Sequence, residues 1–245
     1  MAFFHLPLKE ILRGKGDMKI LAVDTATKSC SVAVVNKRSL LAEMTTVRKQ
    51  THSRHLMKMI EKVIGLSGLA LSELDGFAVT RGPGTFTGMR IGISSVKGLA
   101  TATGKPVVGV SSLDALAMQA SFFPYLICPF IDASRGEVYF SRYKFRNGHL
   151  EKEADEQVSS PEKAVFDLNE TCLFIGDGAL LYQKTILNKM DKSAFFASSF
   201  QNTLRASTVA YISMDRLKND DTDDIGIFVP HYIRKSDAEL NLMVS

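Results

Sequence analysis

Apolar runs and short polar turns alternate along the first part of this chain. Residues 20–23 form a continuous apolar run that ends at Asp24, and a polar turn at 25–29 follows it. Two more segments of strand-like composition, 30–35 and 40–47, are joined by a second short polar turn. Strand-forming runs separated by such turns are typical of antiparallel pairing. The pattern therefore predicts a three-stranded antiparallel meander.

Helical periodicity follows the meander. Residues 51–66 carry apolar side chains at helical spacing, and 76–79 read as a short buried strand. A glycine-rich turn then leads into a helix that is expected to end near Thr103, and an apolar run at 106–110 predicts a fifth strand. The first part is therefore expected to be an antiparallel meander that is followed by helices and further strands.

The second part of the chain repeats this plan. Residues 125–132 form another apolar strand that ends in an aspartate, Asp132, and a polar turn again follows. Asn147-Gly148 is a strong hairpin signal between a strand at 137–145 and one that begins at His149 and fades into charged residues. The remaining elements are a strand at 171–175, a Gly-Asp-Gly turn at 176–178, and helices at 180–188 and 208–217. This internal duplication predicts two similar α/β subdomains, at 18–110 and 111–245.

Composition restricts the class of protein only broadly. The apolar and charged fractions, 45% and 23%, are ordinary for a globular protein. Lys and Arg outnumber Asp and Glu by 30 to 26, a bias that is compatible with RNA but too weak to indicate it. Three separated cysteines argue against a disulfide framework and favour a reducing cytoplasm. No run has the ~18 apolar residues that a membrane span needs, and residues 1–17 are expected to be a disordered, dispensable extension.

The glycine-rich turn carries the first candidate chemistry. A strand, a turn containing Gly82 and Gly84, and a helix that begins near Thr85 can present backbone N–H groups to an anion. The turn lacks the Gly-Lys-Ser/Thr of a Walker loop and the spacing of a Rossmann motif. A tight turn that binds nothing explains the same residues equally well. The sequence leaves both interpretations open.

Two helices carry more apolar or small residues than one buried side needs. The helix at 51–66 has a broad apolar surface, and the helix at 85–103 contains three interior glycines. Glycine lowers helix stability by roughly 1 kcal/mol relative to alanine, so close approach of another backbone is the expected reason. We therefore predict a homodimer contact with two-fold symmetry; the alternative is that the first helix is covered by its own subdomain. The predicted contact residues are Leu56, Met59, Ile60, Val63, Gly88, Met89, Gly92 and Val96.

Three motifs resemble one known family. Arg81-Gly82-Pro83-Gly84-Thr85-Phe86-Thr87-Gly88-Met89-Arg90-Ile91-Gly92 is similar to the signature of the TsaB (YeaZ) family. Pro230-His231-Tyr232-Ile233-Arg234 resembles the tail motif of that family. The segment 132–139 resembles its mid-chain motif, with Ser134 where arginine is common. The resemblance covers most of residues 18–239 and implies two actin-like (ribonuclease H-like) subdomains, each a mixed sheet with an antiparallel meander and flanking helices.

The resemblance also implies a nucleotide cleft between the subdomains. Actin-like proteins hold nucleotide between two aspartate-bearing turns, so ATP or ADP is expected at this cleft or at a shared interface, with no cofactor of the chain's own. The candidate nucleotide-binding residues are Asp24, Thr25, Gly82, Gly84, Thr85, Asp132, Gly176, Asp177 and Gly178. The first turn, 25–27, lacks the glycine that lets a phosphate approach. The cleft is therefore interpreted as vestigial.

Members of the family carry an older peptidase-like (M22, glycoprotease-like) label, which this sequence does not support. His52 and His55 have spacing three and no intervening glutamate, so they do not form a His-Glu-x-x-His site. No catalytic residues and no metal ligands are predicted. The resemblance implies a scaffold that binds TsaD, works with TsaE, and meets tRNA through that complex in threonylcarbamoyladenosine formation. A self-contained actin-like phosphotransferase or ATPase is the alternative.

Overall fold

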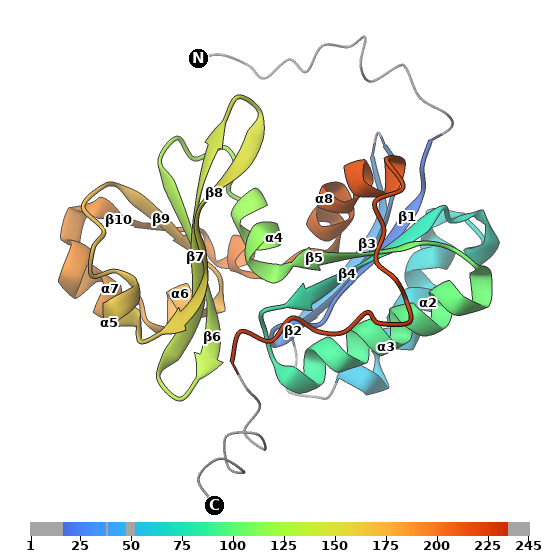
Figure 1. The fold of residues 1–245 in the computed structure, drawn as a ribbon, viewed down its shortest axis with the longest axis horizontal. Helices are drawn as coiled ribbons and strands as arrows, with labels where there is room; N and C mark the ends of the chain where they lie inside the picture. The colour runs from blue at the N-terminus through green and yellow to red at the C-terminus, as the bar shows by residue number, and fades with distance from the viewer. Residues whose placement is uncertain (1–16, 38, 48–51, 235–245) are drawn as a thin grey trace, which may run out of the picture.

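A computed structural model describes residues 17–37, 39–47 and 52–234. The predicted N-terminal extension lies outside the described residues except for Asp17. The chain folds into two sheets of five strands, each with helices packed on it (Figure 1). The expectation of two similar α/β subdomains is therefore confirmed.

The first sheet has the order β3-β2-β1-β4-β5. The antiparallel part is the predicted meander, in which β1 pairs with β2 and β2 with β3. The parallel part is β4 on β1 and β5 on β4. The strands are β1 (Ile20–Asp24), β2 (Ser29–Val35), β3 (Leu40–Val47), β4 (Gly76–Gly82) and β5 (Val107–Ser111). β1 and β2 are buried along their whole length, which explains the continuous apolar run of β1 and the mostly apolar sequence of β2.

Two long helices cover one face of this sheet. They are α2 (Leu56–Ser67) and α3 (Phe86–Thr103), and the short helical turns η1 (His52–Arg54) and η2 (Leu71–Glu73) flank α2. Both helices share one apolar cluster with the sheet. Each ends at a left-handed glycine, Gly68 and Gly104, which is a common helix C-terminus.

The second sheet has the order β10-β9-β6-β7-β8, which repeats the order of the first. Its strands are β6 (Leu126–Ser134), β7 (Glu137–Arg146), β8 (His149–Ser159), β9 (Cys172–Ile175) and β10 (Ala194–Phe196). Its helices are α5 (Pro161–Ala164), α6 (Asp177–Leu181) and α7 (Gln183–Met190), with turns η3 (Asp191–Ser193) and η4 (Ser199–Asn202). β8 runs through the charged segment where the strand was expected to fade, because an edge strand can expose its side chains.

The predicted second subdomain, 111–245, contains a helix that packs on the first sheet. Helix α8 (Ala206–Lys218) packs on β1, β2, β4 and β5 of the first sheet. Its buried residues include Val209 and Leu217, which join the cluster that contains Ile20 and Ala78. The first sheet needs a cover on this second face, and α8 supplies it. Residues 206–234 therefore belong to the first subdomain rather than the second.

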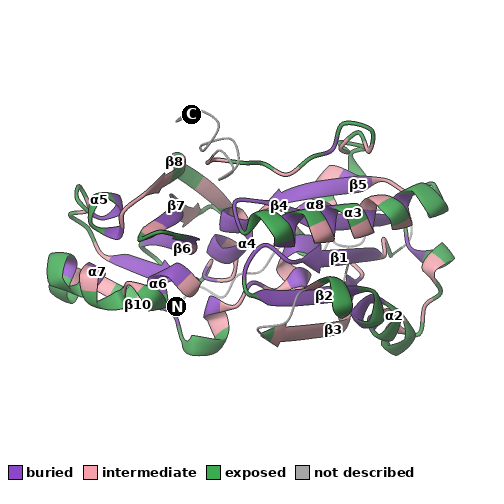
Figure 2. Ribbon diagram, turned by 90° about the horizontal axis from the view of Figure 1, so that it is seen from below, coloured by how far each residue is buried: buried purple, intermediate pink, exposed green. Residues whose placement is uncertain are grey.

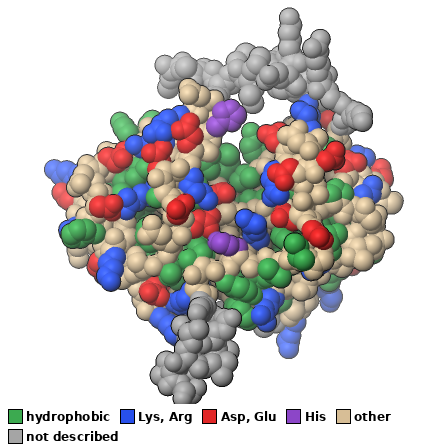
Figure 3. Space-filling view, viewed as in Figure 1, with side chains coloured by type: hydrophobic (Ala, Val, Ile, Leu, Met, Phe, Trp, Pro, Cys, Tyr) green, Lys and Arg blue, Asp and Glu red, His purple; other side chains and the backbone are tan. Residues whose placement is uncertain are grey.

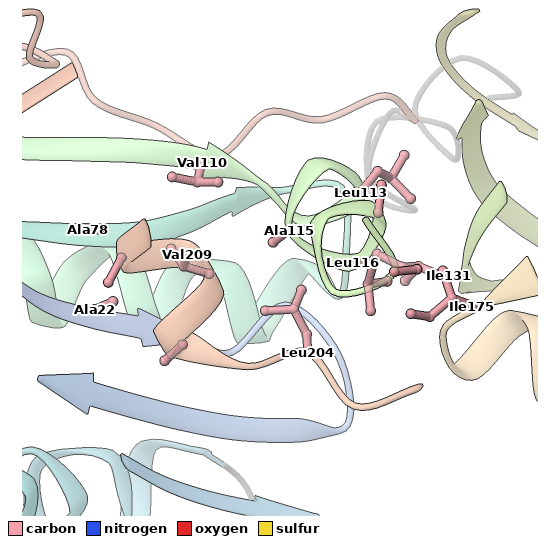
Figure 4. Packing of buried hydrophobic residues seen from close by; sticks show 14 of the residues in the cluster. Ala22, Ala78, Val110, Leu113, Ala115, Leu116, Ile131, Ile175, Leu204 and Val209 are labelled. Atoms are coloured by element: carbon pink, nitrogen blue, oxygen red, sulfur yellow. The ribbon is translucent and has the colours of Figure 1, made fainter. Parts of the chain in front are cut away.

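Helix α4 (Ser112–Met118) joins the two subdomains. The hydroxyl of Ser111 caps it by accepting hydrogen bonds from the N–H groups of Leu113 and Asp114. Figure 4 shows Leu116 directed toward Ile131 and Ile175 of the second sheet. One apolar cluster contains residues of both sheets and of α4. The two subdomains consequently share a core and meet at a packed junction.

Candidate functional site

The glycine-rich turn packs directly on the turn that follows β1. The N–H of Thr85 donates a hydrogen bond to the carbonyl of Ala26 at 2.7 Å. A Cβ on Gly84 would lie 2.3 Å from the same carbonyl oxygen, so only glycine fits there. Gly82, with a φ of 119°, leaves no room either, because a Cβ would lie 2.6 Å from the carbonyl oxygen of His231.

Helix α3 approaches Thr25 just as closely. A Cβ on Gly88 would lie 2.1 Å from the carbonyl oxygen of Thr25, and one on Gly92 would lie 2.3 Å from its Oγ1. The Thr25 hydroxyl donates to the carbonyl of Gly88 at 2.7 Å. The expected close approach of another backbone is thus present, but that backbone belongs to the same chain. Gly98 differs, because a Cβ there would meet nothing within 4 Å.

This packing decides between the two interpretations of the turn. An anion cradle needs free N–H groups. Here the N–H of Thr85 is bonded to Ala26, and the N–H of Gly88 is capped by the Thr85 hydroxyl at 3.3 Å. Two of the N–H groups that a phosphate could use are therefore bonded within the chain, which favours the interpretation as a tight internal turn.

Asp24 is a fully buried carboxylic acid at the end of β1. Its Oδ1 accepts hydrogen bonds from the N–H of Ala26 at 3.1 Å and from the hydroxyl of Thr80 at 2.8 Å. Its Oδ2 is buried without a hydrogen-bond partner among the described residues. Burial, as the largest cause, and the nearby Asp177 together raise the pKa of Asp24 to about 7, against the lowering effect of the two hydrogen bonds.

The Gly-Asp-Gly turn of the second subdomain is also packed against a strand end. Oδ1 of Asp177 accepts from the N–H of Asp132 at 3.1 Å, and burial raises the pKa of Asp177. A Cβ on Gly176 would lie 2.3 Å from the carbonyl oxygen of Phe130, and one on Gly178 would lie 2.9 Å from the carbonyl carbon of Ile131. Both glycines thus permit the turn to contact β6.

The junction brings the three candidate aspartates into one region. Asp177 influences the pKa of Asp24, and Asp132 influences that of Asp177. Lys28 Nζ, from the turn after β1, lies 3.2 Å from Asp132 Oδ2 and so links the two subdomains. The sequence did not single out Lys28. The three aspartates therefore lie in one region, where Asp132 and Asp177 contact groups of the same chain and Asp24 Oδ2 has no hydrogen-bond partner among the described residues.

The predicted interface residues need correction. Leu56, Met59, Ile60 and Val63 are at most 4% exposed, because their side of α2 packs on β2 and β3. Met89 and Val96 lie on the buried side of α3, Val96 in the apolar cluster shared with the sheet, and Gly88 and Gly92 face Thr25. The open alternative, that α2 is covered by its own subdomain, is the correct one for these residues.

Other positions form the outward face of the same two helices. Met57 and Leu66 of α2 are 51% and 71% exposed. On α3 the exposed positions include Ser94, Gly98 and Ala102, all with small side chains. Figure 2 shows the exposed residues of both helices on the side away from the sheet. Helical spacing alone could have separated these positions from the buried ones.

A C-terminal strap, residues 223–234, joins the three motifs. It pairs with β5 at Asp223, and the N–H of His231 donates to the carbonyl of Arg81 at 2.7 Å. Tyr232 stacks on Phe86 with ring centroids 4.9 Å apart, and Arg90 Nε donates to the Tyr232 hydroxyl at 3.1 Å. A final ion pair of 2.7 Å joins Arg234 to Glu137 of β7.

The strap therefore runs over the first subdomain and ends on the second (Figure 1). No sequence pattern indicated these contacts between distant segments. They place the glycine-rich turn, the β6–β7 turn and the tail motif beside one another.

Two further expectations concern histidines and membranes. His52 Nε2 forms a hydrogen bond of 2.9 Å with the carbonyl of Thr27, which places this histidine beside the turn after β1. Within the part of the chain that the structure describes, no three or more His, Cys, Asp or Glu side chains are arranged to hold a metal ion. No helix among those residues combines the length and apolarity needed to cross a bilayer.

Comparisons with known proteins agree with the motifs. A family model described as "TsaD: tRNA N6-adenosine threonylcarbamoyltransferase" matches residues 39–242. The tRNA threonylcarbamoyladenosine biosynthesis protein TsaB of Bacillus subtilis is 31% identical over 91% of this chain and 96% of its own length. The TsaB protein of Haemophilus influenzae is 36% identical over 69% of this chain and 75% of its own.

A solved structure supports the same assignment. YeaZ from Pseudomonas aeruginosa superposes with a TM-score of 0.76 at 28% identity, over 88% of this chain and 99% of that one. The two repeated mixed sheets and this likeness confirm the expected actin-like fold. The chain belongs to the TsaB (YeaZ) family, within the wider family that the TsaD model describes.

Proposed function

We propose that this chain is a non-catalytic scaffold partner of TsaD in the formation of N6-threonylcarbamoyladenosine in tRNA. TsaD would transfer the threonylcarbamoyl group from its adenylate to N6 of the adenosine just 3′ of the anticodon, in tRNAs that read codons starting with A. TsaE would act in the same complex. The chain would stabilise TsaD and meet tRNA only through it.

One observation carries this proposal. The signature segment is used for packing within the chain, where Gly84, Gly88 and Gly92 accommodate the turn after β1. The N–H groups of Thr85 and Gly88, two of those that could hold a phosphate there, are bonded within the chain. Because the most distinctive segment of the chain is used for internal packing, a role as a scaffold is better supported than a role as a phosphotransferase. We therefore propose that any nucleotide of the assembly binds at the interface with TsaD rather than in this chain's own junction.

The proposed partner surface is the outward face of α2 and α3. Its residues on α3 include the small Ser94, Gly98 and Ala102, and Gly98 has open space where a Cβ would be. Small residues let a second helix approach closely, and the exposed Met57 and Leu66 add apolar surface. We propose that one surface serves both a homodimer of the chain alone and a heterodimer with TsaD. Each interface would bury on the order of 1,600 Å².

Reconstitution tests the function. Purified TsaD, TsaE, tRNA and the adenylate are combined with or without this chain, and modified adenosine is quantified. Modification is expected only when the chain is present, while the chain alone produces none and shows no peptidase activity or ATP turnover. Full modification without the chain, or ATP turnover by the chain alone that is lost in Asp24→Asn, would refute the scaffold role.

A pair of matched variants tests the surface. Met57→Glu places a charge on the outward face of α2, and Leu187→Glu places one on α7 of the second subdomain, where the side chain is 39% exposed. Both variants should remain folded. Only Met57→Glu should become monomeric in size-exclusion chromatography and lose TsaD. Equal behaviour of the two variants would place the interface elsewhere.

A further inference from the structure

A cavity of about 290 Å³ lies at the junction of the two subdomains and the strap. It is lined by Arg81 and Gly82 of β4, Ser111 of β5, His231 of the strap, and Lys152, Asp155 and Glu156 of β8. Figure 3 shows acidic and basic side chains interspersed along the junction between the two halves of the molecule. The volume is close to the lower end of the range for small-molecule sites.

Some of the charges in this cavity are already paired. Lys152 Nζ lies 3.1 Å from an oxygen of Asp114 and 3.0 Å from Glu156 Oε1. The Ser111 hydroxyl also donates to Glu156 Oε1 at 2.5 Å. Among the charged groups that the structure describes, the other carboxylate oxygen, Oε2, has only His231 Nε2 within 4 Å, at 3.9 Å. Because the Glu156 side chain is only 11% exposed, this oxygen has lost most of its hydrogen bonds to water without gaining others from the described residues in their place.

Two other charged groups have no partner. Within the described residues, neither the Arg81 guanidinium nor the Asp155 carboxylate takes part in a hydrogen bond or an ion pair. The backbone of Arg81 is fixed by its hydrogen bond from His231, so the unpaired guanidinium starts from an anchored position. The cavity therefore presents one unpaired cation beside one unpaired and one half-paired carboxylate.

We propose that this cavity binds a free α-amino acid with a small polar side chain. The guanidinium of Arg81 would pair with the ligand's carboxylate, and Asp155 and Glu156 would accept hydrogen bonds from its ammonium group. A simple anion would be repelled by the two carboxylates, and a metal ion by Arg81 and Lys152. A zwitterion satisfies both signs at once, and the absence of apolar side chains from the cavity's lining selects against large apolar ligands.

Such a ligand would touch both subdomains and the strap. Binding to the folded arrangement stabilises it by mass action, so the melting temperature should rise with ligand concentration. The site is separate from the outward face of α2 and α3, and it does not depend on the proposed role with TsaD. Loss of TsaD binding and loss of ligand binding can therefore be measured independently.

Binding is tested on the full chain by NMR. Each proteinogenic L-amino acid is added singly at up to about 10 mM, the range in which weak small-ligand binding is detected. A small polar amino acid is expected to shift the amide signals of Gly82 and Ser111. Its N-acetyl derivative and its amide, which lack the ammonium and the carboxylate respectively, should bind at least tenfold more weakly.

Variants test which residues contact the carboxylate and which contact the ammonium group of the ligand. Arg81→Met and Asp155→Asn change exposed side chains, and each should weaken binding of the amino acid at least tenfold. Arg54→Met, an exposed arginine in η1, is the control and should bind normally. Absence of shifts for every amino acid, unchanged binding in Arg81→Met, or equal binding of the N-acetyl derivative would each overturn the proposal.

Discussion

Alanine at three glycines of α3 should change stability in a graded order. Gly98→Ala introduces a methyl group into open space, and Gly88→Ala directs one at the carbonyl oxygen of Thr25, 2.1 Å away. Gly92→Ala meets the Thr25 side chain at 2.3 Å, which can rotate. The same substitution in one helix therefore separates intrinsic helix propensity from close packing.

The magnitudes follow from the contacts. Gly98→Ala should gain roughly 1 kcal/mol from helix propensity, a rise in melting temperature of about 2–4 °C for a chain of this size. Gly88→Ala must displace a backbone carbonyl, and overpacking of this kind costs roughly 1–3 kcal/mol. It also disturbs the hydrogen bond from Thr25, worth about 1 kcal/mol. The net loss should be roughly 2 kcal/mol, and Gly92→Ala should fall between the two.

Urea denaturation followed by circular dichroism measures these differences, provided that the slope of the transition is unchanged. Dilute samples and size-exclusion chromatography keep any self-association of the outward face out of the comparison. If Gly88→Ala were as stable as Gly98→Ala, the close approach of α3 to Thr25 would not restrict this position. The assignment of the signature glycines to internal packing would then be wrong.

Three other changes probe the core, the buried acid and the strap. Met59→Glu should lower the free energy of unfolding by roughly 3–5 kcal/mol, because it leaves a buried carboxylate unpaired; an unchanged urea midpoint would refute the burial of Met59. Burial gives Asp24 a pKa of about 7 in the folded state against 3.8, so stability should fall from about pH 4 to pH 7. Asp24→Asn should abolish that slope in urea titrations, and an unchanged slope would refute it. Arg234→Glu should lose on the order of 1 kcal/mol and Glu137→Arg should restore it; additive effects would show that the two residues do not interact.

The repeated architecture could be predicted because it depends on local patterns. Apolar runs that end at Asp24 and Asp132 mark the first strand of each sheet, and hairpin turns fix the strands that follow. Periodicity does not encode which sheet a distant helix covers. The sequence therefore predicted α8 correctly as an amphipathic helix but placed it in the wrong subdomain.

The candidate site was predicted in part for a similar reason. Glycines at helical spacing correctly indicated that a backbone approaches α3, but spacing cannot show whether that backbone belongs to the same chain. The apolar surface of α2 likewise does not show whether it packs on its own subdomain or on a partner. In the structure its apolar residues Leu56, Met59, Ile60 and Val63 belong to the core. The strap could not be predicted, because stacking of Tyr232 on Phe86 joins residues far apart in the sequence.

Helix α3 has an inner face that packs within the chain and an outward face that we propose for a partner. Its inner face contacts Thr25, the residue after the buried Asp24, and its N-terminal turn carries Phe86 and Arg90, which hold the strap. Its outward face is the one that we propose for a partner. Because packed helices shift as units, a partner that moved α3 would change its contacts with the strap, which reaches the second subdomain through Arg234. A partner on one subdomain could thus alter the junction without touching it.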